Sequence, residues 1–353
     1  MTVYFYGVFE FQGGMENYAK NLITGVLEKD KSIHFAIIKD RPSIAYEDYF
    51  ASLGCDIITI PNQKQHPLKY YKALKNLFSK AKNSNDIVQT NVMSFRNFLL
   101  FRALKASKAK GIIVAHGAGI ARTPLRFLHV LLRPFFKRIG QQVAISKEAA
   151  AFQFGKNNQA KIIPNAIDPR PFGFNAEARD RIRNNLCVSP NTLLLGQVGR
   201  VCPIKNQVFS IRLTKALLDH GVDARLLMIG AIQDARPAKL AEDLHIKEGA
   251  TFLGEANPRE YYSAFDVLLV PSLSEGAGLI INEGEANGVP IIVSTNVPRN
   301  NVNAINMLFV PLECGLWEKA IQSPALTRRF GERCVDNYSA FVDRYQDLFR
   351  SLG

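Results

Sequence analysis

The feature of this sequence that most constrains its fold is a set of short, almost wholly apolar segments. One series comprises residues 3–9, 34–39, 56–60, 86–90, 111–116 and 142–146, and a second comprises residues 193–199, 224–230, 250–254, 266–270, 290–294 and 307–311. Strands that are buried on both faces of a parallel sheet show such runs instead of polar–apolar alternation. Segments with helical periodicity lie between most of them, for example residues 16–29 and 67–82. We therefore predict an α/β protein with two doubly wound, Rossmann-like sheets.

The length of the chain also favours two domains, because 353 residues exceed what one compact core usually contains. Three prolines fall within residues 164–171, between the two series of strands. We predict one domain over residues 1–168, a second over residues 169–333, and a C-terminal helix over residues 334–353. This last helix carries an apolar stripe that we expect to pack into a core, formed by Tyr338, Phe341, Val342, Tyr345 and Phe349.

The positive charge of the chain is concentrated in its first half. The net charge is +13, and residues 1–170 hold 25 Lys and Arg against 11 Asp and Glu. Residues 57–147 hold 17 basic residues and a single acid, Asp86. Such a field attracts an anionic membrane, a nucleic acid or a phosphorylated substrate, and a hydrated surface without a partner is the alternative. No aromatic-rich recognition motif accompanies the charge, so we expect no nucleic-acid partner, and a nucleic-acid-binding protein is a distant alternative.

Residues 122–140 predict a basic amphipathic segment. Thr123 and Pro124 favour a helix start, whereas Pro134 predicts a kink or a break. At helical spacing one face carries Arg122, Arg126, His129, Arg133 and Lys137. Basic amphipathic helices lie on anionic bilayers, so this face is our candidate for contact with a membrane and an acceptor. The alternative is a core helix whose basic face is hydrated.

The sequence shows no secretion signal and no membrane-spanning run. The first residues lack the basic start and the cleavage site of a signal peptide, and no apolar run approaches about 18 residues. The five cysteines are scattered, which fits a reducing compartment. We expect a cytoplasmic protein that lies on the inner face of the cell membrane.

Candidate binding residues follow the ends of the predicted strands, where α/β sheets bind ligands. Gly13 and Gly14 stand where the first strand turns into a helix, although no dinucleotide-binding GxGxxG is present. Arg200 follows the strand at 193–199, and Lys205 opens the next helix. Two cations beside a helix N-terminus can clamp a diphosphate, although an exposed Arg and Lys beside a turn would look the same.

The segment "EGAGLIINEGEANGVP" at residues 275–290 places two carboxylates eight positions apart. Glu275 lies in the loop after a strand, and Gly276 and Gly278 leave room for backbone amides to meet a ligand oxygen. A helix that begins near Leu279 puts Glu283 about one turn in. Carboxylates accept hydrogen bonds from vicinal hydroxyls, so we expect both to bind a ribose or a hexose.

These motifs resemble those of family 4 glycosyltransferases, which are retaining enzymes of the two-domain GT-B fold. The resemblance rests on "GR" with "KNQ" (199–207), on the spacing of Glu275 and Glu283, and on "GGME", "AIS" and "IPNAID" in the same order. The variant "EGEANGVP" is most similar to bacterial capsular and exopolysaccharide glycosyltransferases. Two departures concern Ala277, where the family often has an aromatic residue, and the polar segment 295–306, so the resemblance says little about the acceptor.

The resemblance implies roles for individual residues. Arg200 and Lys205 would hold the donor diphosphate, Glu283 the ribose, and Glu275 with the amides of Ala277 to Leu279 the sugar and the distal phosphate. Gly13 and Gly14 would approach the reacting sugar, and His116 would lie near it, so Glu275 and His116 are the predicted catalytic residues. The last helix would return to the first domain.

The function implied is retaining transfer of a hexose-type sugar from a nucleotide-diphosphate donor to a saccharide acceptor. A UDP-sugar and a polyprenyl-diphosphate-linked acceptor are our expectations for the two substrates. We expect no cofactor and no metal, because cations and helix N-termini can stabilise the leaving diphosphate and the sequence contains no D-x-D motif. A sugar-nucleotide epimerase or hydrolase on the same fold is the alternative.

Overall fold

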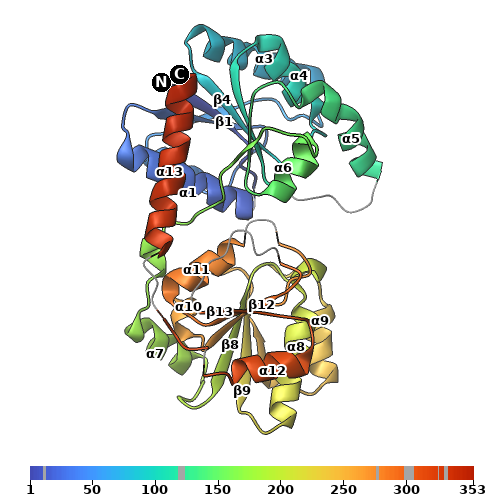
Figure 1. Ribbon diagram of the computed structural model, residues 1–353, viewed down its shortest axis with the longest axis vertical. Helices are drawn as coiled ribbons and strands as arrows, with labels where there is room; N and C mark the ends of the chain where they lie inside the picture. The colour runs from blue at the N-terminus through green and yellow to red at the C-terminus, as the bar shows by residue number, and fades with distance from the viewer. Residues whose placement is uncertain (11–12, 118–123, 276–277, 298–305, 325, 330–332) are drawn as a thin grey trace. The chain divides into compact units, whose positions relative to one another are not determined.

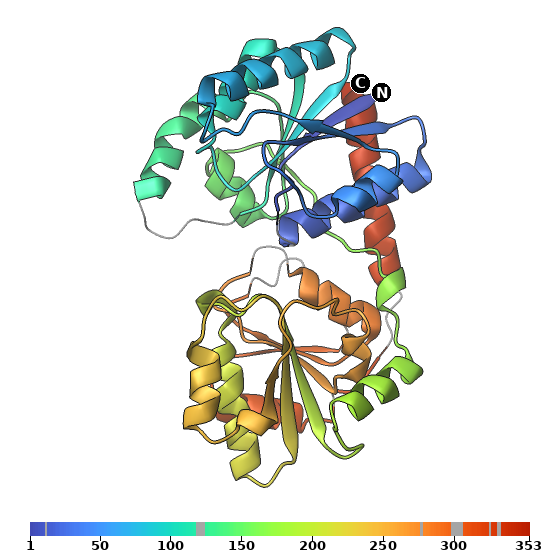
Figure 2. The same ribbon diagram turned by 180° about the vertical axis from the view of Figure 1, so that it is seen from behind.

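The computed structural model of the protein describes residues 1–10, 13–117, 124–275, 278–297, 306–324, 326–329 and 333–353 (Figure 1). The chain divides into two compact units: unit 1 holds Met1–Ile167 with Asn337–Gly353, and unit 2 holds Asp168–Asp336. Each unit contains one sheet of parallel strands with helices on both faces (Figures 1 and 2). The predicted fold class, α/β with two Rossmann-like sheets, is confirmed.

The sheet of unit 1 has the order β3-β2-β1-β4-β5-β6-β7. Its strands are β1 Thr2–Tyr6, β2 His34–Lys39, β3 Asp56–Thr59, β4 Ile87–Val92, β5 Lys110–Ala115, β6 Gln141–Ala144 and β7 Lys161–Ile162. Its helices are α1 Gly14–Lys29, α2 Glu47–Ser52, α3 Pro67–Asn83, α4 Phe98–Ser107, α5 Pro124–Phe136 and α6 Lys147–Phe154. The strand order reverses between β1 and β4, so ligands are expected at the carboxyl ends of these strands.

The sheet of unit 2 has the order β10-β9-β8-β11-β12-β13 and reverses between β8 and β11. Its strands are β8 Leu193–Val198, β9 Ala224–Ile229, β10 Ala250–Phe252, β11 Val267–Val270, β12 Ile291–Ser294 and β13 Met307–Val310. Its helices are α7 Ala176–Asn185, α8 Gln207–Asp219, α9 Arg236–Asp243, α10 Tyr261–Ala264, α11 Leu279–Asn287 and α12 Cys314–Ile321, with short 3₁₀ turns η1 Arg170–Phe172, η2 Pro203–Lys205 and η3 Lys247–Gly249.

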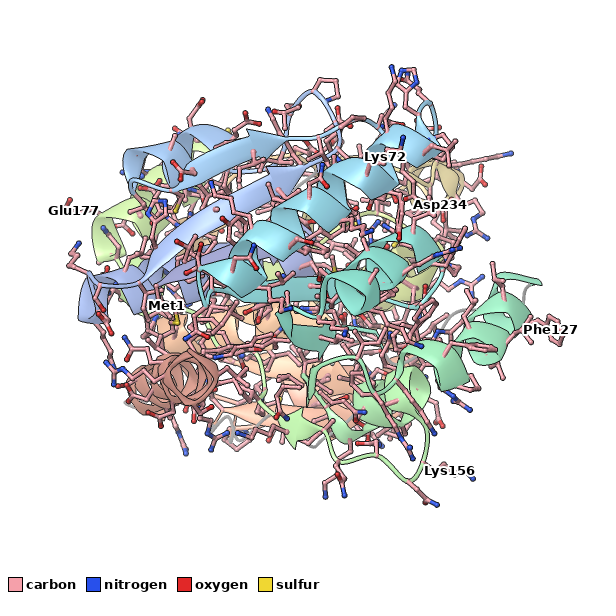
Figure 3. The ribbon with its side chains drawn as sticks, turned by 90° about the horizontal axis from the view of Figure 1, so that it is seen from above. Met1, Lys72, Phe127, Lys156, Glu177 and Asp234 are labelled. Atoms are coloured by element: carbon pink, nitrogen blue, oxygen red, sulfur yellow. The ribbon has the colours of Figure 1, made fainter. Side chains whose placement is uncertain are left out.

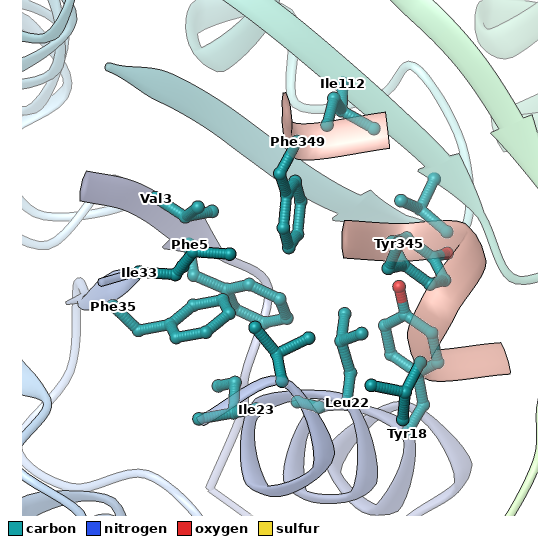
Figure 4. Packing of buried hydrophobic residues seen from close by; sticks show 14 of the residues in the cluster. Val3, Phe5, Tyr18, Leu22, Ile23, Ile33, Phe35, Ile112, Tyr345 and Phe349 are labelled. Atoms are coloured by element: carbon teal, nitrogen blue, oxygen red, sulfur yellow. The ribbon is translucent and has the colours of Figure 1, made fainter. Parts of the chain in front are cut away.

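Helix α13, Arg333–Leu352, packs its apolar stripe into the core of unit 1 (Figure 4). The rings of Tyr345 and Phe349 meet those of Tyr18 on α1 and Phe35 on β2, with centroids 5.9 and 6.1 Å apart. A Cβ atom at Gly25 of α1 would lie 2.4 Å from a methyl group of Val342, so glycine permits the close approach of the two helices. The two chain termini consequently lie side by side (Figures 1 and 2).

Of the kink or break predicted at Pro134, the structure contradicts the break, because helix α5 continues through this residue. The helix runs from Pro124 through Pro134 and ends at Phe136. Pro134 has no amide to donate to the carbonyl of Val130, and its ring crowds that carbonyl, so it is consistent that only Phe135 and Phe136 follow it in the helix. Lys137 therefore lies just beyond the helix, although its amide still donates to the carbonyl of Arg133 at 3.0 Å.

The face that α5 exposes also differs from the prediction. His129, placed on the basic face by its spacing, is fully buried between the amide of Phe95, at 3.1 Å, and the carbonyl of Phe152, at 3.0 Å. The exposed side chains are apolar instead, and we call Phe127, Leu128, Val130, Leu131 and Phe135 the apolar ridge. Phe127 is 73% exposed and points away from the domain (Figure 3).

Two of the predicted basic side chains lie outside the described part of the structure. Arg122 lies outside the residues that the structure describes, as does the side chain of Arg126. Arg133 and Lys137 are half-buried. No helix in the described part of the chain is long and apolar enough to cross a membrane.

Candidate functional site

In unit 2, two loops meet where β8 and β11 end, at the reversal of the strand order. The loop after β8 leads through η2 into α8, and the loop after β11 leads into α11. The amide of Leu273 donates to the carbonyl of Ile204 at 2.8 Å, and the side-chain amide of Asn206 donates to the carbonyl of Pro271 at 3.2 Å. The residues predicted on the two loops are therefore held in one region.

The loop after β8 is shaped by two glutamines that the sequence analysis did not single out. Gln197 donates to the carbonyl of Lys205 at 2.8 Å, and Gln207 donates to the carbonyl of Arg200 at 2.9 Å. Gln207 also accepts from the amide of Cys202 at 3.2 Å. Gln207 belongs to the quoted "KNQ" motif, but its role in holding a loop depends on a backbone path that the sequence does not show.

A second shaping contact needs glycine at two positions. Gly199 and Gly230 have φ angles of +130° and +145°, a region that glycine adopts readily. A Cβ atom at Gly230 would lie 2.3 Å from the carbonyl oxygen of Gly199. The loops after β8 and β9 can touch only because Gly230 has no side chain, whereas at Gly199 it is the φ angle that favours glycine.

The structure joins Lys205 and Glu275, which the sequence analysis predicted on different loops. The Nζ of Lys205 lies 2.6 Å from Oε1 of Glu275, and both side chains are largely buried. The hydroxyl of Ser272, a residue not singled out from the sequence, donates to the same oxygen at 2.6 Å. Lys205 and Glu275 thus form an ion pair that joins the loop after β8 to the loop after β11.

The predicted start of α11 at Leu279 is confirmed. Gly278 precedes it with a φ of +60° and provides no side-chain cap. The residue before α8, Asn206, is also left-handed and makes no side-chain cap. Both helices therefore offer uncapped backbone amides at the carboxyl edge of the sheet, as an anion-binding site requires.

Three further residues were predicted to belong to this region. Arg200 is exposed, and its side chain has no hydrogen-bond or ion-pair partner among the residues that the structure describes. Gly276 and Ala277 lie outside the described residues. The expected contribution of their amides thus remains a prediction.

Glu283 lies one turn into α11, as predicted, and is 7% exposed. Its Oε2 accepts a hydrogen bond of 2.6 Å from the hydroxyl of Tyr262, on α10. Burial raises the pKa of Glu283 to about 7, although Tyr262, Arg259 and Lys205 act in the opposite direction. Lys205 forms an ion pair with Glu275, and its charge also lowers the pKa of Glu283, so the three predicted side chains interact electrostatically.

In unit 1, Gly13 and Gly14 stand at the start of α1. Gly13 is extended, and a Cβ atom there would lie 2.9 Å from Oε2 of Glu16. Glu16 is buried and accepts from the amide of Phe9 at 3.2 Å. Glycine at 13 therefore makes room for the carboxylate that holds the turn after β1, whereas Gly14 has open space beside it.

His116 follows β5 and is buried beside Asn91 and Tyr18. Its Nε2 lies 3.2 Å from Oδ1 of Asn91, and its ring centroid lies 4.5 Å from that of Tyr18. The amide nitrogen of Asn91 donates to the carbonyl of Tyr6 at 3.0 Å, so Oδ1 must be the atom that faces the imidazole. His116 consequently carries its proton on Nε2, and burial lowers its pKa to about 3.

The structure brings the predicted residues to two sheet edges, one in each unit. Glu275, Glu283 and Lys205 share the edge of unit 2, and Gly13 and His116 lie at strand ends in unit 1. Within the described ranges, no three His, Cys, Asp or Glu side chains gather as metal ligands would.

Comparison with known proteins shows which families and enzymes this chain is similar to. Residues 178–311 match the model of the family described as "Glycosyl transferases group 1". A Bacillus subtilis (strain 168) protein named as the glycosyltransferase EpsF is 24% identical over 339 residues, which cover 90% of this chain and 86% of that protein. A UDP-Gal:alpha-D-GlcNAc-diphosphoundecaprenol alpha-1,3-galactosyltransferase from Escherichia coli is 28% identical over 145 residues, which cover 40% of this chain and 37% of that enzyme.

The fold has a solved counterpart. The crystal structure of Anabaena Alr3699/HepE in complex with UDP and glucose matches 99% of this chain and 100% of that chain with a TM-score of 0.79. The sequences are 15% identical, so this likeness concerns the fold alone. It confirms the GT-B fold that the sequence predicted.

Proposed function

We propose that this protein, which carries a group 1 glycosyl transferase domain over residues 178–311, is a retaining glycosyltransferase of family 4. It transfers a hexose from a UDP-sugar to a saccharide carried on a polyprenyl diphosphate. The observation that carries the proposal is the cluster of Lys205, Glu275 and Glu283 beside two uncapped helix N-termini. Such a cluster offers cations and amides to a diphosphate and carboxylates to hydroxyls, which is what a nucleotide sugar needs.

In this proposal, donor binding breaks the ion pair between Lys205 and Glu275. The donor diphosphate takes the ammonium group of Lys205, with Arg200 and the first amides of α11 completing its anion site. Glu275 is then free to accept hydrogen bonds from hydroxyls of the sugar, and Glu283 accepts them from the ribose. The leaving diphosphate keeps these contacts, so its developing charge is stabilised in the transition state.

Transfer proceeds without a metal in this proposal, because Lys205, Arg200 and the helix N-termini supply the positive charge. The sequence contains no D-x-D motif, which is consistent with that division of roles. His116 is a neutral imidazole whose Nδ1 makes no hydrogen bond with the residues that the structure describes, so in this proposal it accepts a hydrogen bond from the transferred sugar and does not act as an acid. The configuration at the anomeric carbon is retained through front-face attack within an ion pair.

In this proposal, unit 1 binds the acceptor and contacts the membrane. Helix α4 packs against both α3 and α5 (Figure 1). The side chains that α3 and α4 expose to solvent include seven cations: Lys69, Lys72, Lys75, Lys80, Lys82, Arg102 and Lys105. None of these cations makes an ion pair within the described residues, because the surrounding sequence holds only Asp86. Cations beside the apolar ridge of α5 suit an anionic bilayer, where a polyprenyl-linked acceptor resides. The pathway that we propose for this transferase is the synthesis of a capsular polysaccharide or an exopolysaccharide.

A transfer assay with defined substrates tests this proposal. UDP-glucose, UDP-galactose and their N-acetyl forms are offered with a polyprenyl-diphosphate-linked sugar in EDTA, and the product is examined by NMR. We expect an α-linked product that depends on both substrates. Conversion of the donor without an acceptor would favour the epimerase or hydrolase alternative, and a β-linked product from an α-linked donor would contradict retention.

A further inference from the structure

Tyr262 is a polar side chain at the edge of the second sheet that has no part in the mechanism above. It lies on α10, between β10 and β11, and is fully buried. Its ring meets those of Phe172 and Phe265 edge to face, with centroids 6.0 and 6.1 Å apart. The hydroxyl is its one polar atom beyond the backbone, and that atom donates to Oε2 of Glu283 at 2.6 Å.

This hydrogen bond makes the two carboxylate oxygens of Glu283 inequivalent. Oε2 is occupied by the tyrosine, whereas Oε1 makes no hydrogen bond with any residue that the structure describes. The terminal torsion of a glutamate is broad and selects no orientation by itself. A fixed donor on one oxygen therefore decides where the other oxygen points.

The position of Tyr262 is itself fixed by contacts between α10, α11 and η1. The side-chain amide of Asn287 donates to the carbonyl of Phe172 at 3.0 Å and to the hydroxyl of Ser263 at 3.1 Å. Arg328 donates to Oδ1 of Asn287 and to the carbonyl of Phe265, the latter at 2.6 Å. The distance from α10 to α11 is thus determined by a network of buried polar groups, and the phenol fits that distance.

We propose that Tyr262 is a positioning residue of the donor site. Its buried hydroxyl turns Glu283 so that Oε1 accepts hydrogen bonds from the vicinal hydroxyls of the ribose of a nucleoside diphosphate. The inference rests on the proposed function, because Glu283 is there the ribose-binding carboxylate.

The charges around Glu283 support this role. The charges of Arg259, which precedes α10, and of Lys205 on η2 both favour the ionised carboxylate, while η1 places the ring of Phe172 against that of Tyr262 and the neighbouring strand β12 contains no ionisable residue. Burial raises the pKa of Glu283 to about 7, and the hydrogen bond from Tyr262 opposes that rise. Loss of the hydroxyl would therefore leave the carboxyl more often protonated near neutral pH, and a protonated oxygen is a poorer acceptor.

The test compares UDP with 2′,3′-dideoxy-UDP by isothermal titration calorimetry at pH 7.5. The proteins are the wild type, Tyr262→Phe and, as a matched control, Tyr261→Phe, whose ring is half-exposed and makes no hydrogen bond to Glu283. We expect wild type and Tyr261→Phe to prefer UDP by roughly tenfold, as one hydrogen bond to a charged group allows. In Tyr262→Phe the preference should fall to about twofold or less.

Each outcome separates positioning from general damage. A merely structural role for Tyr262 would weaken both ligands equally and leave their ratio unchanged, which would overturn the inference. If the wild type binds neither UDP, GDP nor ADP, the proposed function fails first, and the inference fails with it. If Tyr262→Phe does not fold, 3-fluorotyrosine at position 262 is the second variant, because it keeps the ring and its hydroxyl is a stronger donor. A stronger donor lowers the pKa of Glu283, so the preference for UDP over 2′,3′-dideoxy-UDP should develop at a lower pH than in the wild type. An unchanged pH would contradict the inference.

Discussion

At the scale of single residues, Glu283 combines burial with the ribose binding that we propose for it, which requires the carboxylate to be ionised. Its pKa, raised to about 7 by burial, exceeds the ordinary value of 4.5. Between those two pH values the folded state holds a proton that the unfolded state has released, so stability falls as pH rises through this window. The carboxylate is thus held at a cost in stability, as is common at binding sites.

The variant Glu283→Gln should remove this pH dependence. At pH 8 we expect it to be more stable than the wild type by on the order of 3 kcal/mol, whereas at pH 4.5 the two should be nearly equal. Urea unfolding at both pH values measures the difference through the single tryptophan, Trp317, which is buried in unit 2. Equal stability differences at the two pH values would contradict the raised pKa.

His116 gives a second prediction at this scale. Because burial lowers its pKa to about 3, the imidazole should remain neutral, with its proton on Nε2, throughout pH 5–8. Nitrogen NMR shifts of the labelled ring measure both properties. Asn91→Asp places a carboxylate 3.2 Å from Nε2 and should raise this pKa, whereas titration of the wild type near 6.5 would show that the site is open to water.

The sequence predicted those site residues whose chemistry is visible in their type and spacing. Glu275, Glu283 and Lys205 were found because charged residues follow apolar strands. Tyr262, Asn91, Gln197 and Ser272 were not predicted, since their roles depend on hydrogen bonds whose partners are brought close only by the fold or by the path of a loop. A tyrosine beside an apolar strand also fits ordinary core packing, so its type alone carries no signal.

At the scale of elements, α5 shows how an amphipathic pattern can be assigned to the wrong side. The prediction took the basic face as exposed, but His129 on that face is buried, Arg133 and Lys137 are half-buried, and the apolar ridge faces outward. Spacing identifies two faces and does not say which one meets the core. The twelve predicted strands were all found, whereas β7 was missed because two residues are too short for a pattern.

The apolar ridge should decide membrane binding. Replacing Phe127, Leu131 and Phe135 by serine should reduce flotation with anionic liposomes at least severalfold, because about 0.8 kcal/mol is lost for each methylene group that no longer enters the bilayer. The control carries serine at Ile232 and Leu316, which are exposed in unit 2. Absence of wild-type binding at low salt, or equal binding by both variants, would remove this role from α5.

At the scale of the whole molecule, the chain returns at its end to the unit where it began. Helix α13 adds Tyr345 and Phe349 to a core otherwise built from β1, β2, α1 and their neighbours (Figure 4). Unit 1 therefore depends on residues at both ends of the sequence. The stripe of apolar residues in the last helix indicated burial, and its partner could not be read from periodicity alone.

Phe349→Ala should consequently destabilise unit 1 and not unit 2. Truncating a fully buried phenylalanine costs about 3–5 kcal/mol. Circular dichroism should show an earlier unfolding transition, while the fluorescence of Trp317, in unit 2, changes at the wild-type temperature. A parallel shift of both signals would mean that the two units unfold as one.

The central claim is that the edge of β8 and β11 binds a nucleotide sugar. The most direct measurement is the unfolding temperature of the wild type and of Glu283→Ala with UDP-, GDP- and ADP-sugars in EDTA. A ligand at about 100 times its Kd stabilises the folded state by about 2.7 kcal/mol, so UDP-sugars should raise the wild-type transition and leave the variant unchanged. If no donor shifts the wild type, in EDTA or in magnesium, the cluster of Lys205, Glu275 and Glu283 is not a donor site and the account is wrong.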